Sequence, residues 1–392
     1  MVLPAREAVS LPRDRSQRFR FQVPEHWRPR SVNPHAAEAA REVLDWFAGL
    51  GCTLPELARA RKFDVAGYVG IPFPNLSQER TVLTAKYLSL WLLWDDVRVE
   101  RLSGVWRVDA ESLFSGRAPA DMTRFDLGWW QIFRELAESR SPAWMESLCA
   151  AMATWGDAAA REASWMRRYR DHGMSPDLET QMEMRIATIG MYATVYLLED
   201  GYGFELPRAF HEDPTARRLK WLSSQIVGIG NDVFSFGKDA AEDQPNLVTT
   251  LMREAGVGAD EALERLIAAH DGALHEFDRL ASSLPSWGPA VDAVIDRWLA
   301  DVRYASLGFT LWESQAPRYT AHKVVVDGRV VEPGICFVPR SPVREVGPSS
   351  RGAGPSSSRG TAPLSQRGAA PSSSRGAPSS VRTVSGTQPR VR

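Results

Sequence analysis

In the stretch Gln225-Ile-Val-Gly-Ile-Gly-Asn231-Asp-Val-Phe-Ser235-Phe-Gly-Lys238-Asp239, three polar residues recur every fourth position. On a helix this spacing places Asn231, Ser235 and Asp239 on one face over two turns. Amide, hydroxyl and carboxylate oxygens are hard ligands, which suit Mg²⁺ better than zinc or copper. Lys238 lies beside them and offers a compact cation that can reach a phosphate on such a metal. The stretch therefore predicts a magnesium site on a helix.

An apolar, aromatic segment upstream ends in acidic residues, in Leu90-Trp-Leu-Leu-Trp-Asp95-Asp96-Val-Arg-Val-Glu100. Asp95 and Asp96 are adjacent, and Glu100 follows one helical turn later. Three carboxylates at the mouth of an apolar helix repel one another unless a cation lies among them. An ordinary solvated helix end is the alternative, but the amide, hydroxyl and carboxylate set downstream favours a metal.

With these two motifs the chain resembles the bacterial class I terpene synthases, which are also called terpene cyclases. Asp95-Asp96-x-x-x-Glu100 is similar to the aspartate-rich motif of that family. Asn231-Asp-x-x-Ser-x-x-Lys-Asp239 is similar to its second metal-binding triad. The resemblance implies that both motifs bind the same group of metal ions.

Two further segments extend the resemblance, which runs from about residue 21 to residue 319. Arg185-Ile-Ala-Thr-Ile-Gly190 resembles the segment that holds the diphosphate-sensing arginine and the helix break of the family. Arg318-Tyr319 resembles its late Arg-Tyr pair. A structural salt bridge to an acid on another helix is the alternative role for Arg185, and an ordinary helical glycine is the alternative for Gly190.

The chain departs from the family pattern at two positions. Asp239 stands where glutamate is commoner, although the shorter side chain still supplies an anionic oxygen. Arg98 lies inside the acidic motif, where it would either weaken metal binding or point to solvent.

The resemblance implies an all-α, single-domain helical bundle and a lyase that breaks a carbon–oxygen bond of an isoprenyl diphosphate. The product would be a cyclised terpene hydrocarbon or alcohol together with free diphosphate. Farnesyl diphosphate is the favoured substrate, because the chain length and the motif spacing resemble those of the sesquiterpene members. Geranyl and geranylgeranyl diphosphate are kept as alternative substrates. The cofactor implied is Mg²⁺, with three ions in the closed complex.

The resemblance also implies roles for individual residues. The metal ligands would be Asp95, Asp96, Glu100, Asn231, Ser235 and Asp239. The diphosphate contacts would be Arg185, Lys238, Arg318 and Tyr319. The other catalytic positions would be the helix break and two tryptophans of the cavity, namely Thr188, Ile189, Gly190, Trp91 and Trp312. An indole face stabilises a cation by about 0.5 to 2 kcal/mol.

Two other functions are kept as alternatives. A prenyl chain-elongating transferase shares the fold and the magnesium chemistry, but it would carry a second aspartate-rich cluster in place of the Asn/Ser/Asp set. A catalytically inactive helical binding protein derived from the family is the other alternative, and loss of a metal ligand would favour it.

Hydrophobic periodicity predicts a chain of long helices joined by connectors rich in Gly, Pro and Asp. The expected helices are Pro34–Leu50, Glu79–Asp95, Ala143–Tyr169, Leu178–Glu199, Ala216–Phe236, Asp260–Ser282 and Trp287–Trp312. Asp327-Gly328 between two valine runs predicts a β-hairpin. Connectors such as 243–246 are assigned no function.

Composition predicts four segments along the 392 residues. Residues 1–20 are expected to form a flexible N-terminal segment and 321–340 a peripheral hairpin-like extension, while the resemblance implies that 21–320 form a class I terpene synthase domain. Residues 341–392 are expected to form a disordered tail rich in Pro, Ser, Arg and Gly, which has too few large apolar side chains to offset the entropy of ordering. Eight arginines and one glutamate give this tail a net charge of +7, so residues 1–340 carry −8 of the net −1 of the chain.

Composition also limits the partners that we expect. The tail has no aromatic residues for base stacking, so specific nucleic-acid binding is not predicted. The chain contains no uninterrupted apolar run of 18 residues, so a transmembrane segment is not predicted either. Cys52, Cys149 and Cys336 lack metal-ligand spacing and fit a cytoplasmic protein. Homodimer formation is left open.

Overall fold

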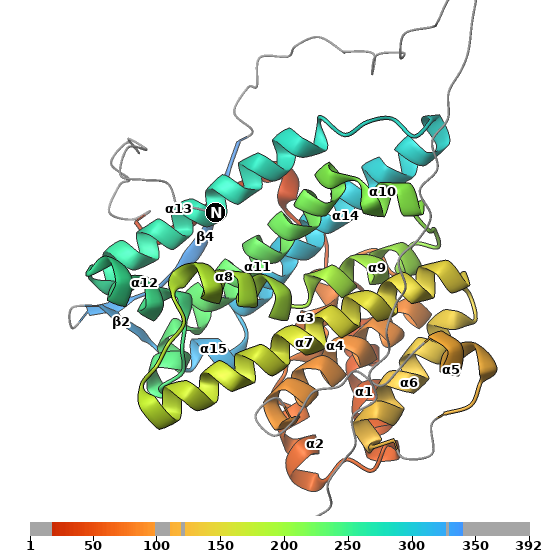
Figure 1. Ribbon diagram of the computed structural model, residues 1–392, viewed down its shortest axis with the longest axis horizontal. Coiled ribbons are helices and arrows are strands. Elements are labelled where there is room, and N and C mark those ends of the chain that lie inside the picture. The colour runs from red at the N-terminus through yellow and green to blue at the C-terminus, as the bar shows by residue number, and fades with distance from the viewer. Residues whose placement is uncertain (1–17, 99–109, 119–121, 327–328, 340–392) are drawn as a thin grey trace, which may run out of the picture. The chain divides into compact units, whose positions relative to one another are not determined.

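The structure is a computed structural model, which describes residues 18–98, 110–118, 122–326 and 329–339. Residue contacts divide the chain into two units, 1–345 and 346–392, and every described residue belongs to the first unit. That unit is a bundle of helices with a few short strands, as Figure 1 shows. The all-α class predicted from the sequence is therefore confirmed. The predicted tail lies outside the described residues.

The elements occur along the chain as follows. The helices are η2 (Glu25–Trp27), α1 (Ala36–Gly49), α2 (Leu54–Ala60), α3 (Val65–Gly70), α4 (Gln78–Arg98), α5 (Ala110–Ser115), α6 (Arg124–Ala137), α7 (Pro142–His172), α8 (Leu178–Thr188), α9 (Met191–Gly201), α10 (Arg208–Glu212), α11 (Pro214–Ala241), α12 (Leu247–Ala255), α13 (Ala259–Ala281), α14 (Pro289–Glu313) and α15 (Pro317–Thr320). The strands are β1 (Arg20–Pro24), β2 (Val324–Val326), β3 (Arg329–Val331) and β4 (Gly334–Val338).

Each long helix expected from periodicity is present, with ends that differ by a few residues. The expected helix at 178–199 is divided into α8 and α9 at Gly190, the residue at which the sequence predicts a break. The helices α2, α3, α5, α6, α10, α12 and α15 were not predicted. Six of them have nine residues or fewer and offer too few turns for a clear periodic pattern. The exception is α6, which has 14 residues, as α1 does, and was missed although it is amphipathic.

Helix α11, which carries the predicted triad, forms the centre of the bundle. It packs against α13 and α14, and also against α8 and α9. Its first turn is stabilised by Asp213, whose carboxylate accepts hydrogen bonds from the backbone N–H groups of Thr215 and Ala216 at 2.8 and 3.0 Å. Most of its residues from Leu219 to Phe236 are buried. The predicted metal face therefore belongs to a helix that its neighbours hold on several sides.

The strands join the two ends of the described chain. β2 and β3 pair in antiparallel register, as the valine runs predict. β4 then pairs in parallel with β1, so that Arg20 faces Gly334 and Pro24 faces Val338. Residues 321–340 were expected to form a peripheral extension, whereas β4 is hydrogen-bonded to a strand near the beginning of the described chain. Phe21 of β1 is fully buried.

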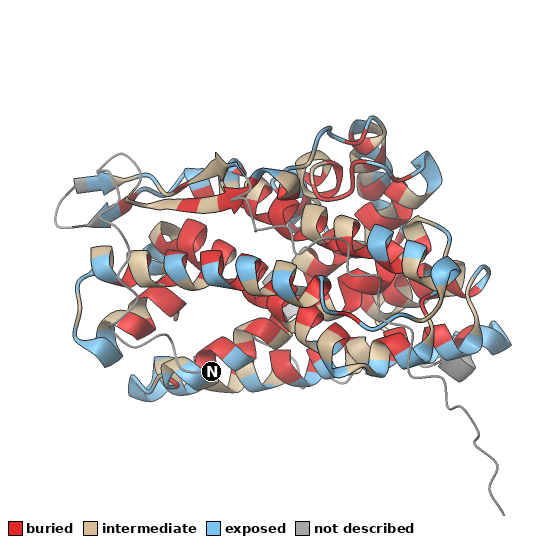
Figure 2. Ribbon diagram, turned by 90° about the horizontal axis from the view of Figure 1, so that it is seen from above, coloured by how far each residue is buried: buried red, intermediate tan, exposed pale blue. Residues whose placement is uncertain are grey.

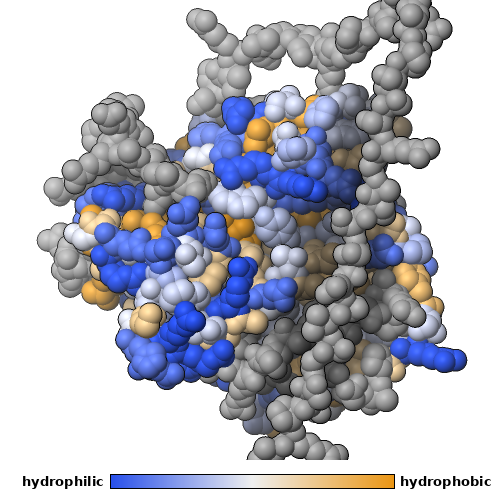
Figure 3. Space-filling view, in the orientation of Figure 1, coloured by the Kyte–Doolittle hydropathy of each residue, from blue (hydrophilic) through white to orange (hydrophobic). Residues whose placement is uncertain are grey.

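Buried residues gather on the inward faces of the helices, and exposed residues follow their outer faces (Figure 2). On the face drawn in Figure 3, hydrophilic residues dominate the visible surface, with smaller hydrophobic areas between them. Among the described residues, we find no helix whose length and apolar content would let it cross a membrane.

Candidate active site

The three residues of the predicted triad lie on α11 and are linked to one another and to neighbours by hydrogen bonds. Ser235 Oγ donates to Asp239 Oδ2 at 2.5 Å. Asn231 Nδ2 donates to Glu313 Oε1 on α14 at 2.9 Å and to the Tyr319 hydroxyl on α15 at 3.1 Å. These bonds point the amide oxygen of Asn231 away from α14 and α15. The amide, hydroxyl and carboxylate oxygens are thus held on one side of the helix.

Arg185 on α8 reaches the same part of α11. Its Nε donates to Asp232 Oδ1 at 2.7 Å, and its Nη2 donates to Asn231 Oδ1. Burial opposes the charge of this guanidinium, but the surrounding carboxylates, Asp232 first among them, together outweigh burial and raise the pKa of Arg185 above its ordinary value. Arg185 is therefore both a cation beside the triad and a member of an inter-helix ion pair.

The other predicted cations and the tyrosine also gather near α11. Lys238 Nζ lies 3.4 Å from Asp239 Oδ1 and 3.0 Å from Glu242 Oε2. Burial opposes the Lys238 charge, but Asp239 and Glu242 together outweigh burial and raise the pKa of Lys238. Arg318 and Tyr319 lie on α15, which packs against α11. The structure thus brings the basic residues of α8, α11 and α15 to one region.

The predicted helix break opens toward an aromatic cluster. α8 ends at Thr188, and Gly190 has a φ of +88°, which favours glycine. The Thr188 carbonyl accepts a hydrogen bond from Trp155 Nε1 at 3.0 Å. The Trp91 ring lies 3.9 Å from the Trp155 ring, measured between centroids. The break therefore lies against Trp91, one of the two tryptophans assigned to the cavity.

A cavity of about 120 Å³ connects these features. One part of its lining is polar and contains Arg185, Asn231, Glu313, Arg318 and Tyr319. The remainder comes from the break and from apolar or aromatic side chains, among them Trp91, Thr188, Ile189, Gly190, Trp312, Tyr68 and Phe309. The Trp312 and Tyr68 ring centroids are 4.2 Å apart. Ser235, Lys238 and Asp239 lie farther along α11 and are not part of this lining.

The aspartate-rich motif is only partly described. Asp95 and Asp96 lie on the last turn of α4, one turn beyond Trp91, but their side chains lie outside the described part of the chain. Glu100 lies outside the described residues altogether. Within the described part, no three histidine, cysteine or carboxylate side chains gather into a metal site. The candidate metal site there consists of the mixed triad on α11.

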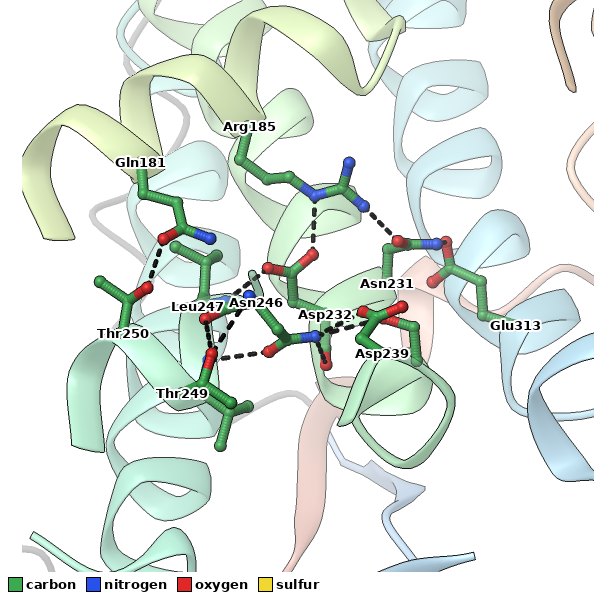
Figure 4. Close-up of polar contacts among 12 residues, drawn as sticks. Gln181, Arg185, Asn231, Asp232, Asp239, Asn246, Leu247, Thr249, Thr250 and Glu313 are labelled. Carbon is green, nitrogen blue, oxygen red and sulfur yellow. Dashed lines mark hydrogen bonds and ion pairs between the residues drawn. The ribbon is translucent and has the colours of Figure 1, made fainter. Parts of the chain in front are cut away.

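Three residues around the triad were not singled out from the sequence. Asp232 pairs with Arg185, Glu313 accepts from Asn231, and Asn246 donates to Asp239 at 2.8 Å (Figure 4). Burial raises the pKa of the Glu313 carboxyl to about 8. Glu313 directly follows Trp312 and Asp232 directly follows Asn231, so their positions beside predicted site residues were the available signal. Asn246 stands in the connector 243–246, where the sequence offered no such signal.

Comparisons with known proteins agree with this geometry. Residues 86–276 match the family model described as terpene synthase family 2, C-terminal metal binding. R-linalool synthase of Streptomyces clavuligerus is 28% identical over 326 residues, which cover 78% of this chain and 94% of that protein. Sesquiterpene synthase 6 of Postia placenta is 24% identical over 326 residues, covering 80% of this chain and 93% of that protein. The crystal structure of linalool/nerolidol synthase from Streptomyces clavuligerus is similar with a TM-score of 0.65 and 25% identity, covering 75% of this chain and 100% of that one.

Proposed function

This chain belongs to the class I terpene synthases, and on that premise we propose that it ionises farnesyl diphosphate and cyclises the hydrocarbon chain, releasing diphosphate. The proposal is supported by one observation above all. Cations from α8 and α15 line the same cavity as Asn231 of the triad, and aromatic and aliphatic side chains make up much of the rest of its lining. A leaving anion and a developing carbocation require these two environments side by side.

The residues on α11 fit a divalent cation of the Mg²⁺ type. Asn231, Ser235 and Asp239 offer neutral and anionic oxygens on one helical face, which is the ligand chemistry that Mg²⁺ prefers. We propose that Asp95, Asp96 and Glu100 complete the metal binding from α4 and the segment after it. Bound Mg²⁺ would neutralise charge on the departing diphosphate. The expectation of three ions remains part of this proposal.

The basic residues would hold the diphosphate by hydrogen bonds. A guanidinium offers two parallel N–H donors to phosphate oxygens, so Arg185 on α8 and Arg318 on α15 can each bind the diphosphate by two hydrogen bonds. Lys238 would add a point charge, and the Tyr319 hydroxyl a further donor. Because Arg185 also binds Asp232 and Asn231, it can transmit the arrival of the anion to the triad.

The aromatic part of the cavity would receive the hydrocarbon chain. Trp91 and Trp312 present indole rings, which exclude water and attract positive charge on carbon. The break at Gly190 would turn the backbone dipoles of residues 188–190 toward the same space. The Thr188 carbonyl is already engaged by Trp155, which leaves Ile189 as the better candidate for this role.

Geranyl diphosphate is the second candidate substrate, because the relatives include a linalool synthase as well as a sesquiterpene synthase. The test is incubation with geranyl, farnesyl and geranylgeranyl diphosphate, each with Mg²⁺ and with excess EDTA. Diphosphate release is measured, and volatile products are identified by mass spectrometry. We expect diphosphate release in the samples with Mg²⁺ and none in the samples with excess EDTA. Farnesyl diphosphate should give cyclic fifteen-carbon products.

A matched pair of variants links the activity to the site. Asn231→Ala should lower turnover by orders of magnitude, whereas Asn75→Ala, the same change at an exposed position, should leave it unchanged. Wild-type turnover that survives excess EDTA, or no release from any of the three substrates, would refute the proposed function.

A further inference from the structure

Asn246 connects the metal face of α11 to the beginning of α12. The residue is fully buried and is the N-cap of α12, where its Oδ1 accepts from the Val248 N–H at 2.8 Å. Its Nδ2 points in the opposite direction, toward α11 (Figure 4). There it donates to Asp239 Oδ2 at 2.8 Å and lies 3.3 Å from Ser235 Oγ. The same nitrogen lies 2.9 Å from the backbone carbonyl oxygen of Asp232.

A second link joins the same two helices. Asp232 Oδ2 accepts from the Leu247 N–H at 2.8 Å, while its Oδ1 accepts from Arg185. The beginning of α12 is therefore fixed to α11 by a carboxylate on one side and by an amide on the other. Figure 4 shows this chain of bonds running from Arg185 through Asp232 to residues 246 and 247.

Capping alone does not account for asparagine at this position. An N-cap needs only an acceptor, which serine, threonine or aspartate supplies as well. Asparagine adds an N–H₂ group, and here that group meets two of the three oxygen-bearing side chains of the triad. Aspartate would cap the helix equally well but would place a second carboxylate against Asp239.

We propose that Asn246 is a positioning residue for the metal triad, which holds the oxygens of Asp239 and Ser235 in place before the metal binds. This inference rests on the proposed function. A carboxylate that is free to rotate loses rotamer entropy when it binds a cation, and a fixed one has already lost it. Partners that orient metal ligands in this way change metal affinity by about 10- to 100-fold when removed.

The experiment measures metal affinity directly, with Mn²⁺ as a paramagnetic substitute for Mg²⁺. Mn²⁺ is titrated into the full-length protein with inorganic diphosphate, and bound metal is followed by electron paramagnetic resonance. Asn246→Ser keeps a capping oxygen and should weaken Mn²⁺ binding by about 10-fold or more. Asn246→Asp keeps the cap fully and should weaken Mn²⁺ binding too, because it replaces the hydrogen bond from Asn246 Nδ2 to Asp239 with repulsion between two carboxylates.

The matched control is Asp213→Ala, which removes the N-cap of α11 at a distance of about 27 Å along the helix from Asn231. This variant should lose thermal stability and keep wild-type Mn²⁺ affinity. A saturating concentration of Mg²⁺ should also restore most of the kcat of Asn246→Ser, which loss of fold would not allow.

Two results would overturn the inference in different ways. If both Asn246 variants bind Mn²⁺ like the wild type, Asn246 is only a helix cap, and the proposed function stands. If the wild type itself binds no Mn²⁺ with diphosphate, the proposed function fails and this inference fails with it. Should Asn246→Ser not fold, Asn246→Asp alone decides the question, because it retains the cap.

Discussion

Gly190→Ala tests whether the helix break and the aromatic wall form one rigid unit. Gly190 has a φ of +88°, and a Cβ at this position would lie 2.7 Å from Trp91 Cζ2 and 2.8 Å from Cη2. The Trp91 ring has little room to retreat, because it packs against Trp155 at 3.9 Å and Tyr87 at 5.9 Å between centroids. The substitution therefore introduces both backbone strain and a steric clash.

The expected loss of stability has two parts. A non-glycine residue in the left-handed region costs roughly 1–2 kcal/mol. Forcing an additional carbon into a packed core costs roughly 1–3 kcal/mol more. Gly190→Ala should therefore lower the free energy of unfolding by about 2–5 kcal/mol, a large part of the ~5–15 kcal/mol that stabilises a typical protein.

Denaturant unfolding of the wild type, Gly190→Ala and Gly173→Ala separates the backbone strain from the steric clash. Gly173 has a φ of +64°, and a Cβ added there would meet nothing within 4 Å, so Gly173→Ala carries the backbone strain alone. The difference between the two variants measures the clash with Trp91, and adding Trp91→Phe to Gly190→Ala should recover part of it. If Gly190→Ala costs no more than Gly173→Ala, then Trp91 moves freely and does not form a fixed wall.

Three further predictions concern other parts of the chain. Arg185→Lys should reduce kcat more than it raises KM, because an ammonium cannot hold a phosphate bidentately; a large fall in melting temperature with intact kcat would instead make the Asp232 ion pair its main role. Burial raises the pKa of Asp301 from 3.8 to about 7, with Arg297 opposing it in part. The folded state therefore retains a proton that the unfolded state loses, and this contribution to stability falls as the pH rises from about 4 to about 7. Asp301→Asn should stabilise the protein more at pH 8 than at pH 5 in thermal unfolding, and an equal effect at both would contradict this. A chain ending at residue 340 should keep the rate and product profile of the full-length protein, because the tail has too few large apolar side chains to form part of a packed wall; a changed product ratio would assign the tail to the active site.

The long helices could be predicted because their information is local. The apolar periodicity of α1, α11 and α13 persists over several turns, and the motif around Gly190 indicated where one predicted helix breaks. Short helices such as α2 depend instead on caps, here Thr53 with Glu56 in a capping box. The pairing of β1 with β4 had no local signal at all, because it joins segments at the two ends of the described chain.

The same distinction applies to the site. The residues proposed to bind metal or diphosphate occur in motifs, so the sequence predicted that Asn231, Arg185 and Tyr319 would lie together, as they do. Residues that orient them act through tertiary contacts. Asn246 depends on the fold of a connector, and Glu313 on the approach of α14 to α11. Nothing in the spacing of these two residues distinguishes them from ordinary helix-end polar residues.

The parallel pairing of β1 with β4 has a consequence for synthesis on the ribosome. Arg20 of β1 cannot pair with Gly334 of β4 until Gly334 has been synthesised, 314 residues later. At translation rates of about 5–20 residues per second, this delay is on the order of tens of seconds. During that time the edge of β1 has no strand partner, and Phe21 and Val23, both fully buried in the finished fold, lack part of their cover. We therefore expect the nascent chain to keep the edge of β1 unpaired for most of its synthesis, and unpaired strand edges favour aggregation.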